Sequence, residues 1–316
     1  MKKPVKVERE LVFTHPDFPL DVSTWEKHPD YPPHTHDFSE IVIIAQGTGF
    51  NVVGEEEFPL GAGDVFVLHG ERPHGYRNTR NLTVINVTYD PALLAATRLD
   101  VAGIPGYQAL FVIEPALRKK GRYERHMHLD MDHLIRIKTL TDAIENELHS
   151  GTARRQSRRY DERHLSGKES TGPRSGNHGC QFMAMGHFMI LVGLLSRWYL
   201  GKPTVETRKI IGIGEAISFL ETRSTENIEV DALARMAGMS RRSFYRVFQE
   251  VTGESPLSWL LHKRIMKAVT LLKTTDKNVT ETAFECGFED SNYFTRQFRR
   301  VMGISPREFR TRQRIF

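Results

Sequence analysis

Residues 234–240 read ARMAGMS, and residues 283–288, about fifty positions later, read AFECGF. Each stretch is followed by two phenylalanines four residues apart, then by a glycine and a Ser-Pro pair. Self-similarity at a fixed offset marks a duplicated structural unit. An alanine-bearing helix, a glycine turn and a second amphipathic helix together form a helix-turn-helix. The repeat therefore predicts an all-α C-terminal domain with two such units, at about 228–250 and 279–301.

The first unit carries a basic face on its second helix. Gly238 suits the left-handed geometry that ends a helix, and Ser240 stands at the N-cap position of the next one. Phe244 and Phe248 begin an apolar stripe at helical spacing, so the opposite face is polar. Four residues at or near the start of this face are candidates for DNA contacts: Ser240, Arg241, Arg242 and Arg246. Arginines four apart on one helix face can reach guanine in a major groove.

The second unit keeps this frame and changes the polar side chains. Asp290 stands in the place of Ser240, Asn292 in the place of Arg242, and Arg296 in the place of Arg246. Asn suits adenine, and Asp either accepts from cytosine N4 or caps the helix. The turn is one residue longer, so the alignment at the helix start is open by one position. These three residues are the DNA-binding candidates of the second unit.

Residues from about 210 to 312 resemble the DNA-binding domain of the AraC/XylS family of transcription regulators. In that family a long helix joins the two units, and here it is expected from about Pro256 to Lys273. The run from Cys286 to Phe294, CGFEDSNYF, is similar to the second unit of the L-rhamnose regulators. The resemblance implies base contacts at the positions of Arg242, Arg246, Asp290 and Asn292. It also implies a homodimer that binds double-stranded DNA and RNA polymerase.

The charge distribution agrees with a DNA-binding C-terminal part. From Arg208 to Phe316 there are 19 Lys+Arg and 13 Asp+Glu, a net charge of +6, whereas the whole chain carries +5, which leaves −1 for the rest. A basic patch of this kind gains affinity for DNA by releasing counterions. We therefore expect binding that weakens steeply with salt.

The N-terminal part is expected to be a β-barrel. Short segments rich in Val, Ile and Phe predict strands at 38–45, 49–53, 57–60, 64–68 and 82–89, and Gly-bearing turns at 47–49 and 61–64 separate them. Such spacing indicates a jelly roll or small barrel. The fold class is thus α+β with two domains: a cupin-like barrel with following helices at 1–205, and the helix-turn-helix domain at 206–316.

One set of residues in the barrel resembles the two cupin motifs. His34-x-His36-x3-Glu40 precedes Gly63-x10-His74-x3-Asn78, and the matching cupin positions ligate a divalent metal. Three imidazoles and a carboxylate suit Zn, Ni, Fe or Mn. In the alternative, His34, His36, Glu40 and His74 line an effector pocket without a metal, because neutral histidines can bind sugar hydroxyls. Both interpretations place these residues inside the barrel.

The segments between the two domains predict helices and a loop. Residues 131–149 form an amphipathic pattern, and 182–200 are apolar on most sides but interrupted by polar residues and glycine, which disfavours a membrane span. The resemblance implies dimerisation by these helices. Residues 151–179 are rich in Arg, Ser, Gly and His and predict a flexible loop, and 201–207 predict the interdomain linker. Two cysteines in different domains and no apolar leader indicate a cytoplasmic protein.

We therefore expect a sequence-specific transcription regulator without enzymatic activity, in which a small molecule binds in the barrel and shifts the dimer between two arrangements. The resemblance implies an activator of a carbohydrate utilisation operon, with a sugar as effector. Two alternatives come from other classes: a metal-dependent cupin enzyme fused to a DNA-binding domain, and an architectural nucleic-acid binder without a ligand.

Overall fold

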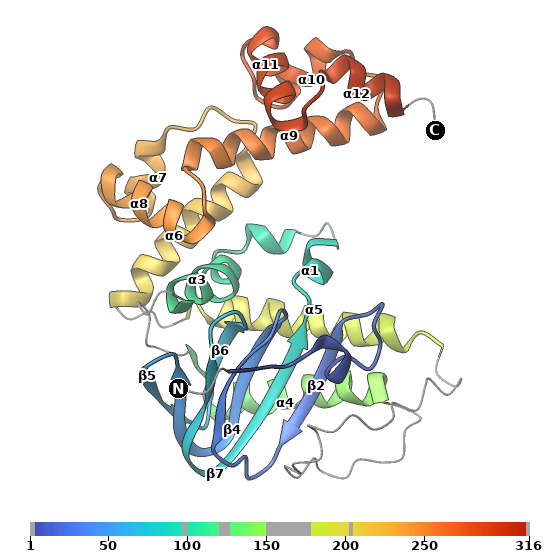
Figure 1. Ribbon diagram of the computed structural model, residues 1–316. Coiled ribbons are helices and arrows are strands. Elements are labelled where there is room, and N and C mark those ends of the chain that lie inside the picture. Colours follow the sequence, from blue (N-terminus) through green and yellow to red (C-terminus); the bar gives the residue numbers. More distant parts are fainter. Residues whose placement is uncertain (1–3, 97–99, 120–126, 150–177, 202–204, 314–316) are drawn as a thin grey trace. The chain divides into compact units, whose positions relative to one another are not determined.

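The computed structural model describes residues 4–96, 100–119, 127–149, 178–201 and 205–313. The chain divides into two compact units (Figure 1). The first comprises Met1–Leu99 and Leu110–Gly201, and the second comprises Asp100–Ala109 and Lys202–Phe316. The short segment Asp100–Ala109, which the sequence assigned to the first domain, thus groups with the helical second unit.

The first unit is built around one sheet whose two longest strands pair along their whole length. The strands are β1 (Val5–Lys6), β2 (Leu20–Trp25), β3 (Tyr31–Thr35), β4 (Ser39–Val53), β5 (Glu56–Gly61), β6 (Asp64–His69), β7 (His74–Tyr89) and β8 (Met127–His128). Their order in the sheet is β1-β3-β7-β4-β6-β8, with β2 added to β7 and β5 to β4. The cupin-like barrel that the sequence predicts is confirmed.

The sequence misplaced one turn. Residues 47–49 do not separate two strands; they lie inside the continuous strand β4, where its pairing with β7 shifts register. Gly47 has φ +82°, and a Cβ there would lie 2.3 Å from the carbonyl oxygen of Asn81 on the neighbouring strand. The glycine therefore serves a bulge that bends β4. The expected turn at 61–64 is confirmed, since β5 ends at Gly61 and β6 begins at Asp64.

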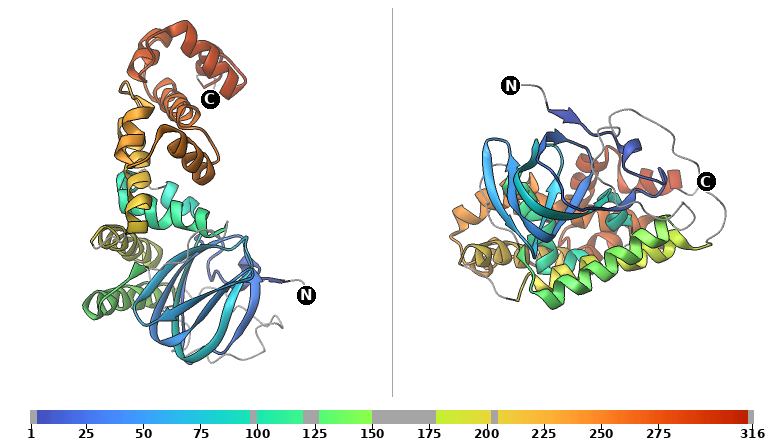
Figure 2. Two further views of the ribbon diagram at one scale, coloured as in Figure 1. Left: turned by 90° about the vertical axis from the view of Figure 1, so that its left-hand side faces the viewer. Right: turned by 90° about the horizontal axis from the view of Figure 1, so that it is seen from below.

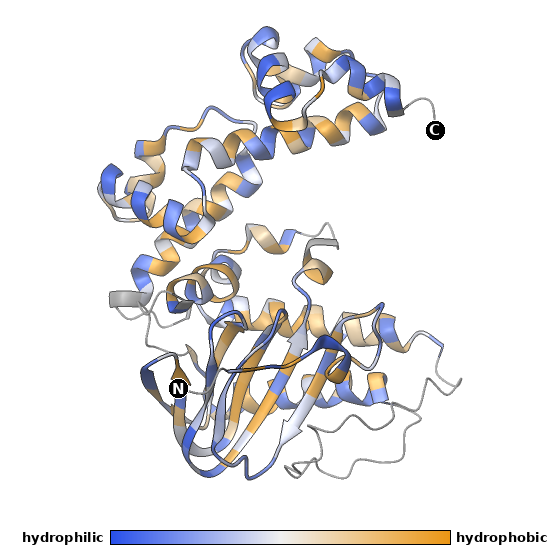
Figure 3. Ribbon diagram, in the orientation of Figure 1, coloured by the Kyte–Doolittle hydropathy of each residue, from blue (hydrophilic) through white to orange (hydrophobic). Residues whose placement is uncertain are grey.

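The two faces of the sheet have different partners. Tyr89 packs on Phe188 with ring centroids 5.2 Å apart, so its face of β7 is covered by helix. The opposite face carries a buried cluster, here called the inner cluster: Val42, Ile44, Leu60, Phe66, Leu68, Tyr76, Leu82 and Val84. Side chains alternate along a strand, so Glu40 shares the face of Val42, and His74 that of Tyr76. Figure 3 shows apolar residues running along the central strands.

Helices α4 (Met131–His149) and α5 (Cys180–Trp198) lie side by side against the sheet (Figure 2). The helix expected at 131–149 is confirmed, and the one expected at 182–200 begins two residues earlier. By length and composition alone, the α5 helix could cross a membrane. A helix buried in a protein core can have the same length and composition. Its side chains at Phe188, Leu191 and Leu195 are fully buried in the first unit. The expected loop at 151–179 lies almost wholly outside the described residues.

Shorter helices complete the first unit and extend into the second. They are η1 (Arg9–Leu11), α1 (Ala92–Ala96), η2 (Asp100–Gly103), α2 (Pro105–Tyr107), η3 (Gln108–Ile113) and α3 (Glu114–Lys119). Gln108 Nε2 donates to the carbonyl of Ala102, which closes the segment of η2 and α2 on itself. A Cβ at Gly214 would lie 2.6 Å from the carbonyl oxygen of Pro105, so this segment packs closely on helix α6 (Val205–Arg223).

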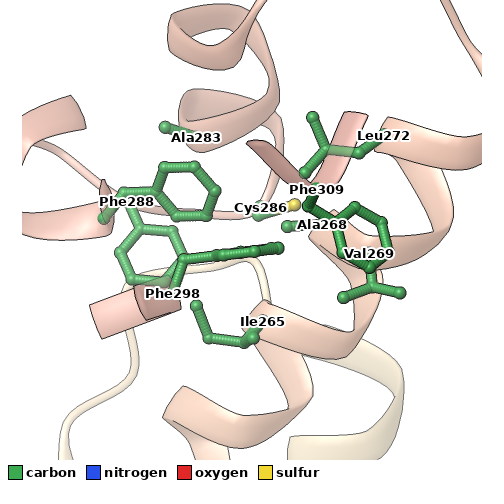
Figure 4. Packing of buried hydrophobic residues seen from close by; sticks show 10 residues of the cluster. Ile265, Ala268, Val269, Leu272, Ala283, Cys286, Phe288, Phe298 and Phe309 are labelled. Atoms are coloured by element: carbon green, nitrogen blue, oxygen red, sulfur yellow. The ribbon is translucent and has the colours of Figure 1, made fainter. Parts of the chain in front are cut away.

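The second unit is entirely helical in the described residues. After α6 come α7 (Val230–Met236), α8 (Arg241–Thr252), α9 (Pro256–Thr274), α10 (Val279–Glu285), α11 (Ser291–Met302) and α12 (Pro306–Gln313). The linker expected at 201–207 is too long, because α6 already begins at Val205. Figure 4 shows the apolar core of the second half, in which Phe288, Phe298 and Phe309 pack against Ile265 and Val269 of α9.

Candidate functional site

The first helix-turn-helix has the local geometry that its sequence predicts. Helix α7 ends at Met236, and Gly238 takes φ +62° in the turn. The Ser240 side chain accepts a hydrogen bond from the backbone N–H of Ser243, so it is the N-cap of α8. Phe244 and Phe248 are fully buried, which turns the opposite face of α8 outward.

The second helix-turn-helix repeats this geometry at an offset of fifty residues. Asp290 caps α11 by accepting from the backbone N–H of Tyr293, and Phe294 and Phe298 are buried as their counterparts are. The caps at Ser240 and Asp290 settle the alignment that the longer turn left open. Arg242 and Asn292 are therefore equivalent: each is the second residue of its helix. Ser240 and Asp290, named as DNA contacts, both have capping roles.

The polar face of each second helix is exposed. Arg241, Arg242, Arg246, Asn292 and Arg296 are all exposed. Arg241 forms an ion pair with Asp231 at 3.0 Å, and Arg246 one with Glu250 at 3.7 Å. In the part of the chain that the structure describes, the side chains of Arg242 and Asn292 form neither a hydrogen bond nor an ion pair. Two equivalent side chains with hydrogen-bonding groups are thus available to an external partner.

Arg264 of α9 makes a set of contacts between the two helix-turn-helix units, here called the lock. Its Nε donates to the Ser224 carbonyl and its Nη2 to the Glu226 carbonyl, both at 2.7 Å, and its guanidinium lies 5.8 Å from the Phe288 ring centroid. A Cβ at Gly287 would lie 2.3 Å from the carbonyl oxygen of Thr225. The loop before α7 therefore packs directly on the turn before α11, and this contact joins the two helix-turn-helix units.

The barrel brings the four cupin-like residues together. His34 pairs in register with His74 across β3 and β7, His36 follows just after β3, and Glu40 comes from β4. The ring centroids of His34 and His74 lie 4.3 Å apart, and those of His36 and His74 4.9 Å apart. We call these four residues the histidine centre. Asn78, the remaining polar position of the motif, is exposed and does not join it.

Close contacts define the geometry of the histidine centre. The two Nε2 atoms of His36 and His74 are 3.2 Å apart, and the Glu40 carboxylate oxygen lies 3.6 Å and 3.7 Å from them. One ligand atom each from His34, His36 and His74 fits within a span of 4.8 Å. The set could therefore hold one metal ion or the hydroxyl groups of a small molecule.

The electrostatics of the centre favour a neutral histidine beside a carboxylate. Burial first, and repulsion from His74 second, lower the pKa of His34 to about 3. Burial alone would raise the pKa of Glu40, yet the charge and hydrogen bonding of His36 and His74 hold that pKa well below its ordinary value. Burial, and then the Glu40 carboxylate, raise the pKa of Tyr76. Near neutral pH the centre thus contains a carboxylate and an uncharged His34.

Sequence reasoning missed polar residues on the same inner face. Asn51 is opposite Tyr76 in the β4–β7 pairing, and Asn86 is opposite Val42. Both amide atoms of Asn51 and the Oδ1 of Asn86 are buried without a hydrogen-bond partner in the described part of the chain. Gly70 was missed as well; a Cβ there would lie 1.9 Å from His36 Nδ1, so glycine makes room for that ring. Only the strand register of Asn51 and Asn86, which depends on pairing with distant residues, could have identified the two asparagines.

Comparisons with known proteins match both units. A model of a helix-turn-helix domain family matches residues 233–312, and a model of the AraC-like ligand binding domain matches residues 20–161. The chain is 30% identical over 285 residues to the HTH-type transcriptional activator RhaS of Enterobacter sp. (strain 638), covering 89% of this chain and 87% of that protein. It is 29% identical over 280 residues to RhaS of Klebsiella pneumoniae (strain 342), with the same coverage.

Among solved structures, the DNA-binding domain of AdpA in complex with a target DNA is 38% identical to the matched part, with a TM-score of 0.32. The match covers 33% of this chain and 94% of that one. An AraC-type regulator from Chromobacterium violaceum is 31% identical, with a TM-score of 0.31, over 32% of this chain and 91% of that one.

Proposed function

We propose, from the premise that the chain belongs to the AraC family of DNA-binding transcription regulators, that it is a sugar-responsive activator. The family membership rests on the RhaS relatives, which are matched over most of their length, and it confirms the predicted regulator of the AraC type. The relatives are transcriptional activators, which favours a regulator over an enzyme. The proposed setting is the cytoplasm, with RNA polymerase as a partner at the promoter.

One observation carries the DNA-binding part of the proposal: the two unpartnered side chains at equivalent positions, Arg242 and Asn292. An exposed guanidinium matches the O6 and N7 acceptors of guanine, and an exposed amide matches the N6 donor and N7 acceptor of adenine. Arg241, Arg246 and Arg296 on the same faces add further base or phosphate contacts. Each helix would lie in its own major-groove segment, about one turn (~34 Å) from the other.

The inner face of the barrel supports a polyhydroxylated effector. Buried amides normally satisfy their hydrogen bonds, and leaving them unpaired costs free energy. Asn51 offers two donors and an acceptor that the protein leaves unused, and Asn86 offers a further acceptor. Together with His34, His36, Glu40 and His74, these groups supply both donors and acceptors, and sugar hydroxyls can bond to either kind. We therefore place the effector against this inner face.

The α5 helix supports a homodimer through an exposed face. Met183 and Ile190 are exposed by 47% and 50% and stand seven residues apart, which places them on one side of the helix. Gly186 and Gly193 share this side, and an added Cβ at either would meet nothing within 4 Å. A flat stripe between two apolar side chains allows another helix to approach closely, and exposed apolar patches of this kind mark interaction sites. We propose that the same stripe of a second copy covers it.

The proposal is tested with the full-length protein and the DNA upstream of its own and neighbouring genes. Binding is measured by fluorescence anisotropy, with and without a panel of pentoses, deoxyhexoses and uronates, and transcription is measured from the same fragments. We expect one fragment to bind selectively and one sugar to raise transcription from it. Binding without preference among fragments would support the architectural alternative, and turnover of a sugar would support the enzyme.

A further inference from the structure

One segment of the chain belongs by packing to both units. Residues 100–109 group with the helical second unit, whereas residues 110–119 group with the first unit, which holds the barrel. Where the two parts meet, η3 (Gln108–Ile113) forms a π-helical turn, a conformation that is rare in proteins and frequent at functional sites. We call residues 100–119 the coupling segment, and different contacts hold its two halves.

The first half of the coupling segment lies closely on one face of α6. Gly214, Ser218 and Thr222 follow one another at intervals of four residues, so they share that face. A Cβ at Gly214 would lie 2.6 Å from the carbonyl oxygen of Pro105. A Cβ at Gly103 would lie 2.9 Å from Cγ2 of Thr222, and the Ser218 hydroxyl donates to a backbone carbonyl of the segment at 3.5 Å. Small residues on both surfaces therefore permit an approach that larger ones would prevent.

Helix α6 in turn contacts the first helix-turn-helix. A Cβ at Gly212 would lie 2.9 Å from the Cα of Ala237, which ends α7 directly before the turn. Gly212 and Gly214 are two residues apart and thus about 200° apart around α6. The coupling segment and α7 therefore pack on opposite sides of this helix. A displacement of the segment acts through α6 on the turn that precedes α8.

The second half of the coupling segment is held in the first unit by buried polar side chains. Glu114 of α3 is fully buried; it accepts a hydrogen bond from the Tyr199 hydroxyl and forms an ion pair with Arg118 at 3.3 Å. Tyr199 directly follows α5. A buried ion pair contributes little net stability relative to well-packed apolar side chains, because both charges lose their hydration. This cost favours a positioning role for the three residues over a purely stabilising one.

The same half is attached to the inner face of the barrel at two points. The Arg118 guanidinium lies 5.5 Å from the ring centroid of Phe66, a member of the inner cluster. The Arg118 carbonyl accepts a hydrogen bond from the Arg72 side chain, and the Arg72 carbonyl accepts one from Nδ1 of His74. A change in the inner cluster or in the histidine centre therefore reaches α3 through direct contacts.

We propose that the coupling segment transmits changes at the inner face of the barrel to α6 and the first helix-turn-helix, with Glu114 and Tyr199 as positioning residues. The inference rests on the proposed function in that an effector on the inner face would cause such a change. An effector shifts an equilibrium only through unequal contacts with two states, and the contacts of Phe66 and His74 are those it would alter. Because a chain of contacts is not itself a coupling free energy, the test perturbs both halves of the segment.

The experiment follows hydrogen exchange of backbone amides by mass spectrometry in the full-length protein, without DNA and without a sugar. Tyr199→Phe removes the hydroxyl that bonds Glu114 and keeps the ring. We expect α6 peptides within residues 210–222 to exchange at least about 5-fold faster than in the wild type, which is the lower end of typical coupling between sites. Peptides of α12 should exchange at the wild-type rate. Glu114→Gln is a second variant with the same expected result.

Ser196→Ala is the matched control. Ser196 is also buried, lies on α5 three residues before Tyr199, and donates one hydrogen bond to the Val192 carbonyl of its own helix. Its loss should leave the exchange of α6 unchanged, which separates loss of the contact with Glu114 from a general loss of stability. Circular dichroism checks that each variant folds.

A double variant tests whether the effect passes through the segment. Gly214→Ala places a methyl group against the Pro105 carbonyl and so displaces the coupling segment from α6. In that background Tyr199→Phe should no longer accelerate the exchange of α6, because the path between them is already broken.

Three results would overturn the inference: unchanged exchange of α6 in the folded Tyr199 and Glu114 variants, an equal acceleration in Ser196→Ala, or additive effects of Tyr199→Phe and Gly214→Ala. The measurement uses neither DNA nor a sugar. Its failure is therefore distinguishable from failure of the proposed function, which the binding and transcription assays test.

Discussion

Arg242 and Asn292 show how one helix-turn-helix frame can present two different side chains, which we propose to read two different bases. The N-caps at Ser240 and Asp290 begin the two helices at equivalent points, so the second residue of each projects in the same direction from its unit. On the proposed function, Arg at this position would prefer guanine and Asn would prefer adenine. The packing can stay the same, because a pair of buried phenylalanines forms the opposite face of both helices.

We predict that Arg242→Ala and Asn292→Ala each cost about 1–3 kcal/mol of binding free energy on the cognate site, because each removes a bidentate contact to one base. Discrimination at that base should fall, and affinity for unrelated DNA should change little. The measurement is anisotropy on the cognate duplex and on single-base variants of it.

Matched controls separate base contacts from general charge and composition. Arg208→Ala removes the same charge from an exposed position on α6, and Asn227→Ala removes an exposed amide from the loop before α7. Both should leave base discrimination intact. If Arg242→Ala lost the same binding free energy on every duplex, the Arg242 side chain would contact phosphate and not a base.

His28 supplies a pH dependence of stability. Burial lowers its pKa below the ordinary value of 6.5. The unfolded chain therefore takes up a proton near pH 6.5 that the folded state refuses, so stability is complete above that pH and falls below it, by at most about 1.4 kcal/mol per pH unit.

The measurement compares unfolding free energies of the wild type and His28→Gln between pH 7.5 and 5. The difference between the two proteins should shift as the pH falls through 6.5, in the sense that the wild type loses stability faster. A difference that stays constant over this range would show that His28 titrates alike in both states.

At the scale of elements, sequence periodicity was sufficient for helices and insufficient for the long strands. The apolar spacing predicted α4 and the two recognition helices, because those patterns are local. Strand β4 was predicted as two strands, since the bulge at Gly47 resembles a turn when its partner strand is unknown, and only the second part of β7, residues 82–89, was predicted. Asn51 went unnoticed for the same reason: its place on the inner face depends on register with Tyr76.

The lock between the helix-turn-helix units gives a prediction for Arg264. Arg264→Lys retains the charge but cannot reach two carbonyls at once, and hydrogen bonds that involve a charged group contribute about 1.5–3 kcal/mol each. We expect lower stability and a larger loss of affinity for a two-segment site than for a half-site. Equal losses on both duplexes would show that the lock does not set the spacing of the helices. Lys263→Ala, which removes the neighbouring half-buried ion pair with Glu221, is the control.

The apolar stripe on α5 gives a prediction for assembly. Ile190→Arg places a charge in the middle of the proposed dimer contact, where it would have to be buried without a partner. We expect the protein to become monomeric by light scattering at concentrations where the wild type is a dimer. Leu257→Arg adds the same charge at a matched exposure of 51% in the second unit and should stay dimeric. A dimeric Ile190 variant would place the contact on another surface.

Across the whole molecule, sensing and reading are divided between two units of opposite character. The barrel unit encloses polar side chains among buried aliphatic ones, whereas the helical unit exposes arginines on both recognition faces. From Arg208 to Phe316 the net charge is +6, in a chain whose total is +5. The net positive charge of the chain therefore lies in the helical unit, where it favours general attraction to DNA phosphates, and we propose that Arg242 and Asn292 add the preference for a site.

The most direct test of paired recognition is selection of bound sequences from a pool of random duplexes, using the full-length protein at moderate salt. We predict enrichment of two short segments separated by about one helical turn, ~34 Å. Arg242→Ala should erase the preference in one segment and Asn292→Ala that in the other. Recovery of no enriched sequence, or of a single segment that both variants affect alike, would contradict the account.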